Sequence, residues 1–226
     1  MTHKPFALLV ALLLPCFAAA QNITVTKKTA SKKVKADTEY CFSTEAEVHI
    51  ETPSFNHKTN SKIKDKLNSK VKEFMKGMTT SNNGCNLSVG YSGEYVSDTL
   101  VSIQFNISES GWSATGVESR SATLNLIISE ESSEVMSAPA KLPKKSLPSI
   151  ELLCRKHLKS SISDSGIGDF LDEIPTKCDL VESSTFALTN KGTMFFVQVY
   201  TATKMFDIEV VIPYSELSTS KLLFGI

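Results

Sequence analysis

Two serine–lysine pairs in this sequence have the spacing of a known serine nucleophile motif. Segments 61–64 (SKIK) and 69–72 (SKVK) both match S-x-x-K, the motif that carries the nucleophile of penicillin-interacting enzymes. The companion S-D-N motif is absent, and residues 191–193 (KGT) have the wrong order for K-T-G. Because a lysine-rich and serine-rich helix produces S-x-x-K by chance, we interpret both matches as structural.

Paired carboxylates are the second possible source of chemistry, because glycoside hydrolases place two of them beside the bond that they cleave. Four acids flank predicted strand loops and could meet in space: Glu94, Asp98, Glu109 and Glu118. Scattered surface acids explain this pattern better. We therefore predict no catalytic residue, and a small cell-wall hydrolase that uses Glu94, Asp98 or Ser69 is the alternative.

Metal chemistry has little support in the residue pattern. Beyond residue 20 the histidines are His49, His57 and His157, and none is spaced with another histidine or a cysteine as zinc ligands are. His157 follows Cys154 by three residues, but two ligands do not close a site. We predict no metal and no cofactor.

The loop at residues 110–116 (SGWSATG) holds the only tryptophan of the sequence, Trp112. An aromatic side chain on a loop between two strands often anchors a partner or a sugar. A packed lid residue is the equally supported alternative.

The elements that must position these residues follow from hydrophobic periodicity. Apolar residues recur at helical spacing over 63–78 and over 150–162, which predicts two amphipathic helices. Alternation over 87–91, 101–107 and 122–128 predicts strands with one covered face and one wet or polar face. The sequence therefore predicts an α+β fold, with a mainly antiparallel sheet packed by two amphipathic helices.

The segments between these elements carry weaker patterns. Residues 21–38 contain few large apolar side chains, which predicts a flexible leader or an irregular edge strand. An alternating strand over 45–51 is expected to end at Pro53. Residues 130–148 indicate a surface linker, so that one domain, 21–226, has an N-terminal half to about residue 130 and a C-terminal half from about residue 148.

Residues 1–20 have the form of a cleavable secretory signal peptide. Lys4 precedes an apolar run over 6–14, and three alanines at 18–20 supply the small residues that signal peptidase requires. The run is too short to span a membrane, and no other segment approaches about 20 apolar residues. We expect a periplasmic or secreted protein without a transmembrane segment.

Removing the signal peptide leaves four cysteines in a compartment that permits oxidation. Of the three possible connectivities we favour Cys41 with Cys85 and Cys154 with Cys178, because local loops close more easily. Four buried thiols are the alternative, since Cys154 could face a core at its helical spacing.

Charge is uneven along a chain whose formal net charge is zero, because residues 21–80 hold 12 lysines against seven acids. Such an excess could attract an anionic polymer, although a solvated helix face is the stronger interpretation. Export and the lack of aromatic residues among these lysines argue against nucleic acid.

The C-terminal stretch and the order of the elements carry a family likeness. The matching positions are Phe186, Leu188, Thr189, Gly192, the run 194–200, Val210, Ile212, Pro213, Tyr214, Glu216 and Leu217. Upstream, an Asn/Lys-rich helical segment over 60–75 precedes strands at 100–103 and 123–128 in the same order. This pattern resembles the lysozyme-sensing domain of RsiV-type anti-sigma factors and the accessory N-terminal domain of some peptidoglycan deacetylases.

The resemblance implies an α/β domain without catalysis, which in one branch grips lysozyme through a glycine-rich turn and a late hairpin. The positions that would inherit this role are Gly111, Trp112, Ser113, Gly116, Tyr200 and Phe206. The sequence departs from the family at residues 111–114 (GWSA), where a Gly-Gly-Ala-His-like turn is usual. It also lacks a sensor's membrane and cytoplasmic parts and a deacetylase domain, so signalling and deacetylation are not expected to transfer.

The sequence thus favours a non-enzymatic, secreted or periplasmic binding module of the cell envelope, with lysozyme or a peptidoglycan-like glycan as the ligand. A small cell-wall hydrolase, and an envelope or virulence factor with an unknown protein partner, are the alternatives.

Overall fold

A computed structural model describes residues 22–36, 41, 44–79, 85–110, 117–138, 142–165, 180, 186–200 and 205–217. At positions 93, 117–119, 165, 198–200 and 205–207 it describes the backbone alone. The expected signal peptide lies outside these ranges, so export stays a prediction. The described chain divides into an N-terminal unit, residues 22–140 with 185–190, and a C-terminal unit that includes residues 141–184 and 191–226.

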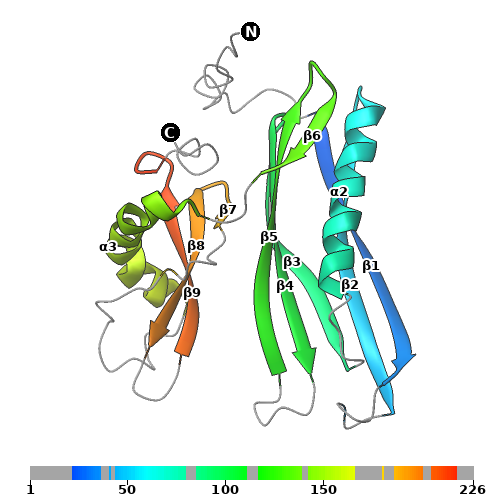
Figure 1. The fold of residues 1–226 in the computed structure, drawn as a ribbon, viewed down its shortest axis with the longest axis horizontal. Coiled ribbons are helices and arrows are strands. Elements are labelled where there is room, and N and C mark those ends of the chain that lie inside the picture. The colour runs from blue at the N-terminus through cyan, green and yellow to red at the C-terminus, as the bar shows by residue number, and fades with distance from the viewer. Residues whose placement is uncertain are drawn as a thin grey trace. The chain divides into compact units, whose positions relative to one another are not determined.

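The N-terminal unit is built on a six-stranded sheet, whose strands lie side by side in chain order (Figure 1). The strands are β1 (Ile23–Lys35), β2 (Glu45–His57), β3 (Leu87–Val96), β4 (Leu100–Ser110), β5 (Val117–Ser129) and β6 (Glu134–Ser137). Neighbours pair antiparallel except β2 and β3, which pair in parallel over residues 48–50 and 87–89. The predicted α+β class and mainly antiparallel sheet are confirmed.

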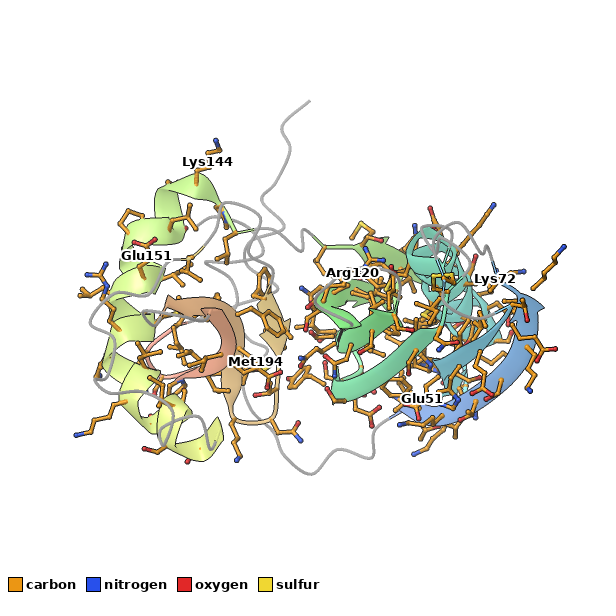
Figure 2. The ribbon with its side chains drawn as sticks, turned by 90° about the horizontal axis from the view of Figure 1, so that it is seen from below. Glu51, Lys72, Arg120, Lys144, Glu151 and Met194 are labelled. Carbon is orange, nitrogen blue, oxygen red and sulfur yellow. A yellow bond between two sulfur atoms is a disulfide. The ribbon has the colours of Figure 1, made fainter. Side chains whose placement is uncertain are left out.

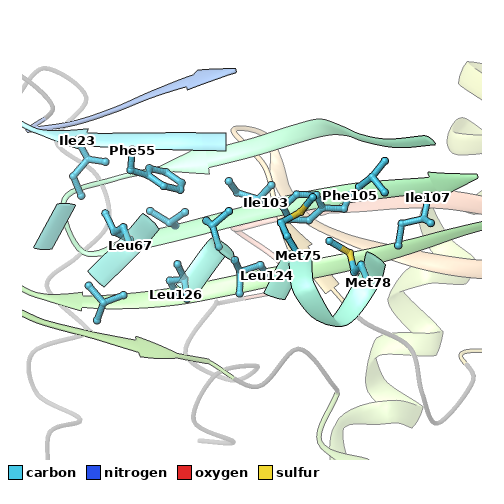
Figure 3. Packing of buried hydrophobic residues seen from close by; sticks show 14 of the residues in the cluster. Ile23, Phe55, Leu67, Met75, Met78, Ile103, Phe105, Ile107, Leu124 and Leu126 are labelled. Atoms are coloured by element: carbon cyan, nitrogen blue, oxygen red, sulfur yellow. The ribbon is translucent and has the colours of Figure 1, made fainter. Parts of the chain in front are cut away.

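Helix α2 (Ser61–Thr79) covers one face of this sheet, as Figure 3 shows for its apolar contacts with β4 and β5. Its buried side chains recur every three or four positions and are Ile63, Leu67, Val71, Met75 and Met78. Fully burying a side chain of this size stabilises a fold by roughly 1.5–3 kcal/mol relative to exposure. The predicted first helix is confirmed, and its apolar face is what fixes it on the sheet.

The two N-terminal strands are longer and more regular than the sequence indicates. Most of segment 21–38, expected to be flexible or irregular, forms the edge strand β1, which pairs with β2 along its whole length. β2 continues through Pro53 to His57, so the expected end at the proline is wrong. Among the described strands, β2 pairs beyond Ile50 only with β1, and a proline can face the side that has no ladder.

The other face of β4 and β5 is polar, as alternation predicts, but it is buried rather than wet. Ser102 and Asn125 are each 1% exposed, and the Ser102 hydroxyl donates to Asn125 Oδ1 at 2.6 Å. The short strand β7 (Phe186–Leu188) lies there. The Leu188 N–H donates to Ser102 Oγ at 2.9 Å, and Asn125 Nδ2 donates to the Phe186 carbonyl at 3.1 Å. Polar side chains on this face therefore hold a strand in place.

The C-terminal unit contains a 3₁₀ turn, η1 (Lys144–Ser146), helix α3 (Leu147–Ser165) and an antiparallel hairpin of β8 (Gly192–Tyr200) and β9 (Met205–Pro213). The buried side chains of α3 lie on one side, and the helix packs along β9. The second predicted helix is confirmed. That both helices cover one sheet stays a prediction. The linker expected over 130–148 includes strand β6, which pairs with β5.

A disulfide joins Cys41 to Cys85, as predicted. The two cysteines precede β2 and β3, and the parallel pairing of these strands begins shortly after them. The bridge spans a sequence separation of 44 and so restricts the unfolded chain. Cys154 is buried on α3, and its predicted partner Cys178 lies outside the described residues, so that pairing stays a prediction.

Candidate functional site

The serine–lysine matches lie on the surface of α2. Ser61, Ser69 and Lys72 are exposed, on the side of the helix away from its buried face. Figure 2 shows Lys72 at the outside of the N-terminal unit. An open helix face does not enclose a substrate, so this placement favours the structural interpretation of both motifs.

The loop acids are spread along the β3–β4–β5 ladder. Asp98 accepts hydrogen bonds from the Asn22 backbone N–H at 2.8 Å and from its side-chain amide at 3.2 Å, which ties the start of β1 to the β3–β4 turn. Glu109 lies toward the other end of β4 and pairs with Arg120 of β5 at 2.9 Å. Glu118 is described by its backbone only. Glu94 remains, and it lines a depression.

The residues that the family resemblance implicates in binding are not tested by the structure. Gly111, Trp112, Ser113 and Gly116 lie outside the described residues. Tyr200 and Phe206 are described by their backbones, which pair with Met205 and Val199 respectively at the end of the β8–β9 hairpin. Their role in ligand binding stays a prediction.

An open depression in the N-terminal unit brings charged and aromatic side chains together. It has a volume of about 350 Å³ and is lined by Val25, Lys27, Tyr91, Ser92 and Glu94. Glu51, labelled in Figure 2, lies beside it, with its Oε2 atom 2.7 Å from Lys27 Nζ. The same ammonium lies 4.9 Å from the centroid of the Tyr91 ring. Lys27 is thus held between a carboxylate and an aromatic face.

The end of the parallel β2–β3 ladder creates this arrangement. Backbone pairing stops at Ile50 and Val89, so the Tyr91 N–H needs another acceptor. The Glu51 carboxylate accepts this N–H as well as the Lys27 ammonium. One side chain therefore continues the strand contact where the backbone ladder has ended.

A β-bulge in β3 then brings Glu94 to the same face of the sheet as Tyr91. The pairing with β4 shifts between Tyr91 and Gly93, so Tyr91 lies opposite Phe105 and Glu94 lies opposite Ile103. Both partners on β4 are fully buried core residues. Without the extra residue, Tyr91 and Glu94 would point to opposite faces, because side chains alternate along a strand.

The two carboxyl groups have pKa values displaced in opposite directions. The hydrogen bond from Lys27 holds the pKa of Glu51 below its ordinary value. Burial opposes this effect, and the Lys27 charge and the Tyr91 N–H add smaller lowering contributions. Glu94 is an exposed residue, but partial desolvation of its carboxyl raises its pKa, and the Lys27 charge only partly opposes this. The pKa of Tyr91 is raised by burial and by both carboxylates, so the phenol stays protonated.

A second polar cluster, which we call the joint, connects the start of α2 to the β5–β6 turn. The His57 side chain is 1% exposed, and its Nε2 lies 2.6 Å from Glu130 Oε1. The N–H groups of Thr59 and Asn60 point at Nδ1, at 3.3 and 3.0 Å. Because Nδ1 must accept from these donors, the neutral ring carries its proton on Nε2 and donates it to Glu130.

The joint also includes the N-cap of α2. Asn60 Oδ1 accepts the Ile63 N–H at 3.2 Å, and Asn60 Nδ2 donates to Ser133 Oγ at 2.9 Å. One turn further along the helix, Lys66 pairs with Glu134 at 2.6 Å. These contacts hold β6 against the beginning of α2.

Sequence reasoning selected Glu94 but missed the other residues of the depression. Lys27 lies in the segment expected to be irregular, and Glu51 lies at the end of a strand expected to be short. The alternation over 87–91 predicts a strand that includes Tyr91 and gives this residue no further role. The usable signal is Ser92-Gly93 within an alternating run, because an inserted glycine in a strand often marks a bulge.

Comparison with known proteins identifies the fold. A solved DUF3298 family protein from Pseudomonas aeruginosa PAO1 superimposes with a TM-score of 0.50 at 14% identity, covering 86% of this chain and 93% of that one. A DUF3298 family member from Bacteroides fragilis NCTC 9343 gives a TM-score of 0.48 at 14% identity, covering 88% and 93%. The first of these likenesses shows a shared fold. No family model matches the sequence. No curated protein matches it either.

The described residues include neither a candidate metal-binding group nor a candidate membrane-spanning helix. Within them, no group of three or more His, Cys, Asp or Glu side chains is placed to hold a metal ion. No helix in the described part of the chain is both long and apolar enough to cross a membrane.

Proposed function

We propose that this chain is a non-enzymatic binding module of the cell envelope, secreted or periplasmic, whose ligand is lysozyme or a peptidoglycan-like glycan. The observation that carries the proposal is the open depression between β1 and β3. It presents an aromatic ring, an ion pair and a partly desolvated carboxyl on a preformed sheet, and a few convergent polar groups in a concavity are typical of a binding site.

Two further observations support this choice. Lys27 and Glu51 engage each other, which suits a fixed recognition surface better than a nucleophile poised for attack. The resemblance of the C-terminal motifs to lysozyme-sensing domains supports the choice of ligand. The DUF3298 fold adds only the architecture, since likeness at 14% identity does not carry function.

Retention on immobilised ligands tests the proposal directly. The protein is passed over c-type lysozyme and over insoluble peptidoglycan, with and without a chitin oligomer as competitor. We expect retention on at least one matrix. Trp112→Ala and Glu94→Gln then show whether the predicted loop or the depression makes the contact, and Glu131→Gln, an exposed acid of the β5–β6 turn, is the matched control. Release from both matrices in the first wash would reject the proposal.

A small cell-wall hydrolase is the second candidate, and one observation favours it. The pKa of Glu51 is lowered while that of Glu94 is raised, and such a division separates a carboxylate from a general acid in glycosidases. The assay is release of reducing ends from peptidoglycan. Glu51→Gln and Glu94→Gln should each abolish turnover, Glu131→Gln should retain it, and Ser69→Ala separates a serine route. The absence of turnover in the unsubstituted protein would exclude this candidate.

A further inference from the structure

The charges around the depression do not balance. Lys27 and Glu51 form a close ion pair and cancel each other. Glu94 adds a second carboxylate, and no ion pair with it forms among the residues that the structure describes. The depression therefore carries a net charge of −1 when Glu94 is ionised, and this charge belongs to Glu94, an exposed residue of its lining.

The position of Glu94 makes a bound cation favourable. The bulge in β3 places its carboxyl on the same face as the Tyr91 ring, where packed atoms remove part of its hydration. A carboxylate that has lost water and is only partly compensated by a neighbouring charge gains more from an incoming cation than one in full solvent. Lys27 does not fill this role, because its ammonium is 2.7 Å from Glu51.

The size and the walls of the depression limit the ligand further. A volume of about 350 Å³ lies near the lower end of the roughly 300–1,000 Å³ typical of ligand pockets. Val25 supplies an apolar wall along which a methylene chain can lie, as lysine and arginine side chains do. An anion would find Lys27 already paired, and a neutral sugar would leave the charge of Glu94 uncompensated.

We propose that the depression receives a single lysine or arginine side chain of a protein partner, with its cationic end at Glu94 and its stem against Val25. This inference rests on the proposed binding function and specifies the chemistry by which the partner is recognised. Glu94 is the specificity-determining residue. Glu51 holds the Lys27 ammonium in an ion pair, so that Lys27 does not compete with the ligand for Glu94. Tyr91 forms the inner wall and packs against Phe105, with ring centroids 6.2 Å apart.

The test is a chemical-shift titration of the full chain with Nα-acetyl-argininamide. The matched probe is Nα-acetyl-citrullinamide, which has nearly the same shape without the charge. We expect the arginine probe to shift the amides of Val25, Tyr91 and Glu94 with a dissociation constant in the millimolar range. The unsubstituted protein should bind the citrulline probe about three- to tenfold more weakly than the arginine probe. Glu94→Gln should bind the arginine probe more weakly by about the same factor, while Glu131→Gln should match the unsubstituted protein.

The pH dependence has a defined sign. Binding should weaken as the pH falls, because protonation of Glu94 removes the charge that the cation meets. Since the pKa of Glu94 is raised, the loss should begin at a higher pH than for an ordinary glutamate. Lys27 on β1 and Tyr91 on β3 also act on this carboxyl, and Glu51 on β2 pairs with Lys27. Neither the lowered pKa of Glu51 nor the raised pKa of Tyr91 reverses that sign.

The outcomes separate this inference from the proposed function. Three outcomes would overturn the inference. They are equal shifts with citrullinamide, an unaltered dissociation constant for the arginine probe in Glu94→Gln, and shifts at these amides only with chitotriose. Retention on lysozyme or peptidoglycan without binding of the arginine probe would support the proposed binding function. It would reject the proposal that the depression receives a basic side chain. Arginine binding without retention on either matrix would support the inference and reject those two ligands.

Discussion

The joint and the depression are both polar clusters of the N-terminal unit, but they differ in how completely their groups are partnered. In the joint, both nitrogens of His57 are engaged and the ring is 1% exposed. In the depression, Lys27 and Glu51 pair with each other, while Glu94 lines the same depression and forms no ion pair with a described residue. The first cluster is closed by its own residues, and the second leaves one charge for an outside group.

This difference separates a structural role from a recognition role. A buried group with every hydrogen bond satisfied positions the elements that carry it, and removing it leaves its partners unsatisfied. A partly solvated group without a partner contributes little to folding and is available for binding. Substitutions in the joint should therefore lower stability, and substitutions at Glu94 should alter binding with little change in stability.

The largest expected effect is that of His57→Leu. The N–H groups of Thr59 and Asn60 would lose their acceptor inside the fold, and we expect the free energy of unfolding to fall by about 2–3 kcal/mol. Urea denaturation at neutral pH measures it. The matched control is His49→Leu, where the ring shares an exposed 2.8 Å hydrogen bond with Ser31, and we expect a loss below about 1 kcal/mol. Equal losses would show that the joint is no more structural than the surface.

A smaller loss is expected at the N-cap of α2. Asn60→Ala removes both the acceptor for the Ile63 N–H and the donor to Ser133, which together should cost about 1–2 kcal/mol. Asn60→Ser keeps a capping oxygen but is too short to reach Ser133, so its loss should be intermediate. Denaturation of both variants checks this order. If serine and alanine proved equal, capping would not contribute, and the Ser133 contact alone would fix β6.

The regular parts of the fold could be predicted because their energetics are local. The buried positions of α2 and the alternation in β4 report directly which side of each element is covered. The course of β1 could not, because a lysine- and threonine-rich edge strand is stabilised by pairing with β2 and not by its own pattern. Burial of Ser102 and Asn125 depends on β7, which is more than 60 residues away from Asn125 in sequence.

The depression was harder to predict than the fold for the same reason. Glu94 and Tyr91 share a face only because of a bulge, and periodicity assigns them to opposite faces. Lys27 and Glu51 meet through the register of the β1–β2 pairing, which extends beyond the strand that the sequence predicts. Sequence patterns identified the acid but not its surroundings, and the surroundings determine its chemistry.

The smallest expected effect is also the sharpest contrast between Glu51 and Glu94, because their contributions to stability should change with pH in opposite directions. Glu94 has a raised pKa, so its contribution is present at low pH and is lost as the pH rises from its ordinary range through the folded value. Glu51 has a lowered pKa, so its contribution is present above the ordinary value and is lost as the pH falls through the folded value.

Unfolding free energies of the unsubstituted protein, Glu94→Gln and Glu51→Gln, measured from acidic pH below the ordinary glutamate range up to neutral pH, test this contrast. Relative to Glu94→Gln, the unsubstituted protein should lose stability as the pH rises above the ordinary glutamate range. Relative to Glu51→Gln, it should gain stability as the pH rises toward that range from below, because the Lys27 ammonium and the Tyr91 N–H favour the ionised carboxyl. Curves of the same sign would mean that both carboxyls see one environment, and Glu94 would then lose its distinction as the group left open to a partner.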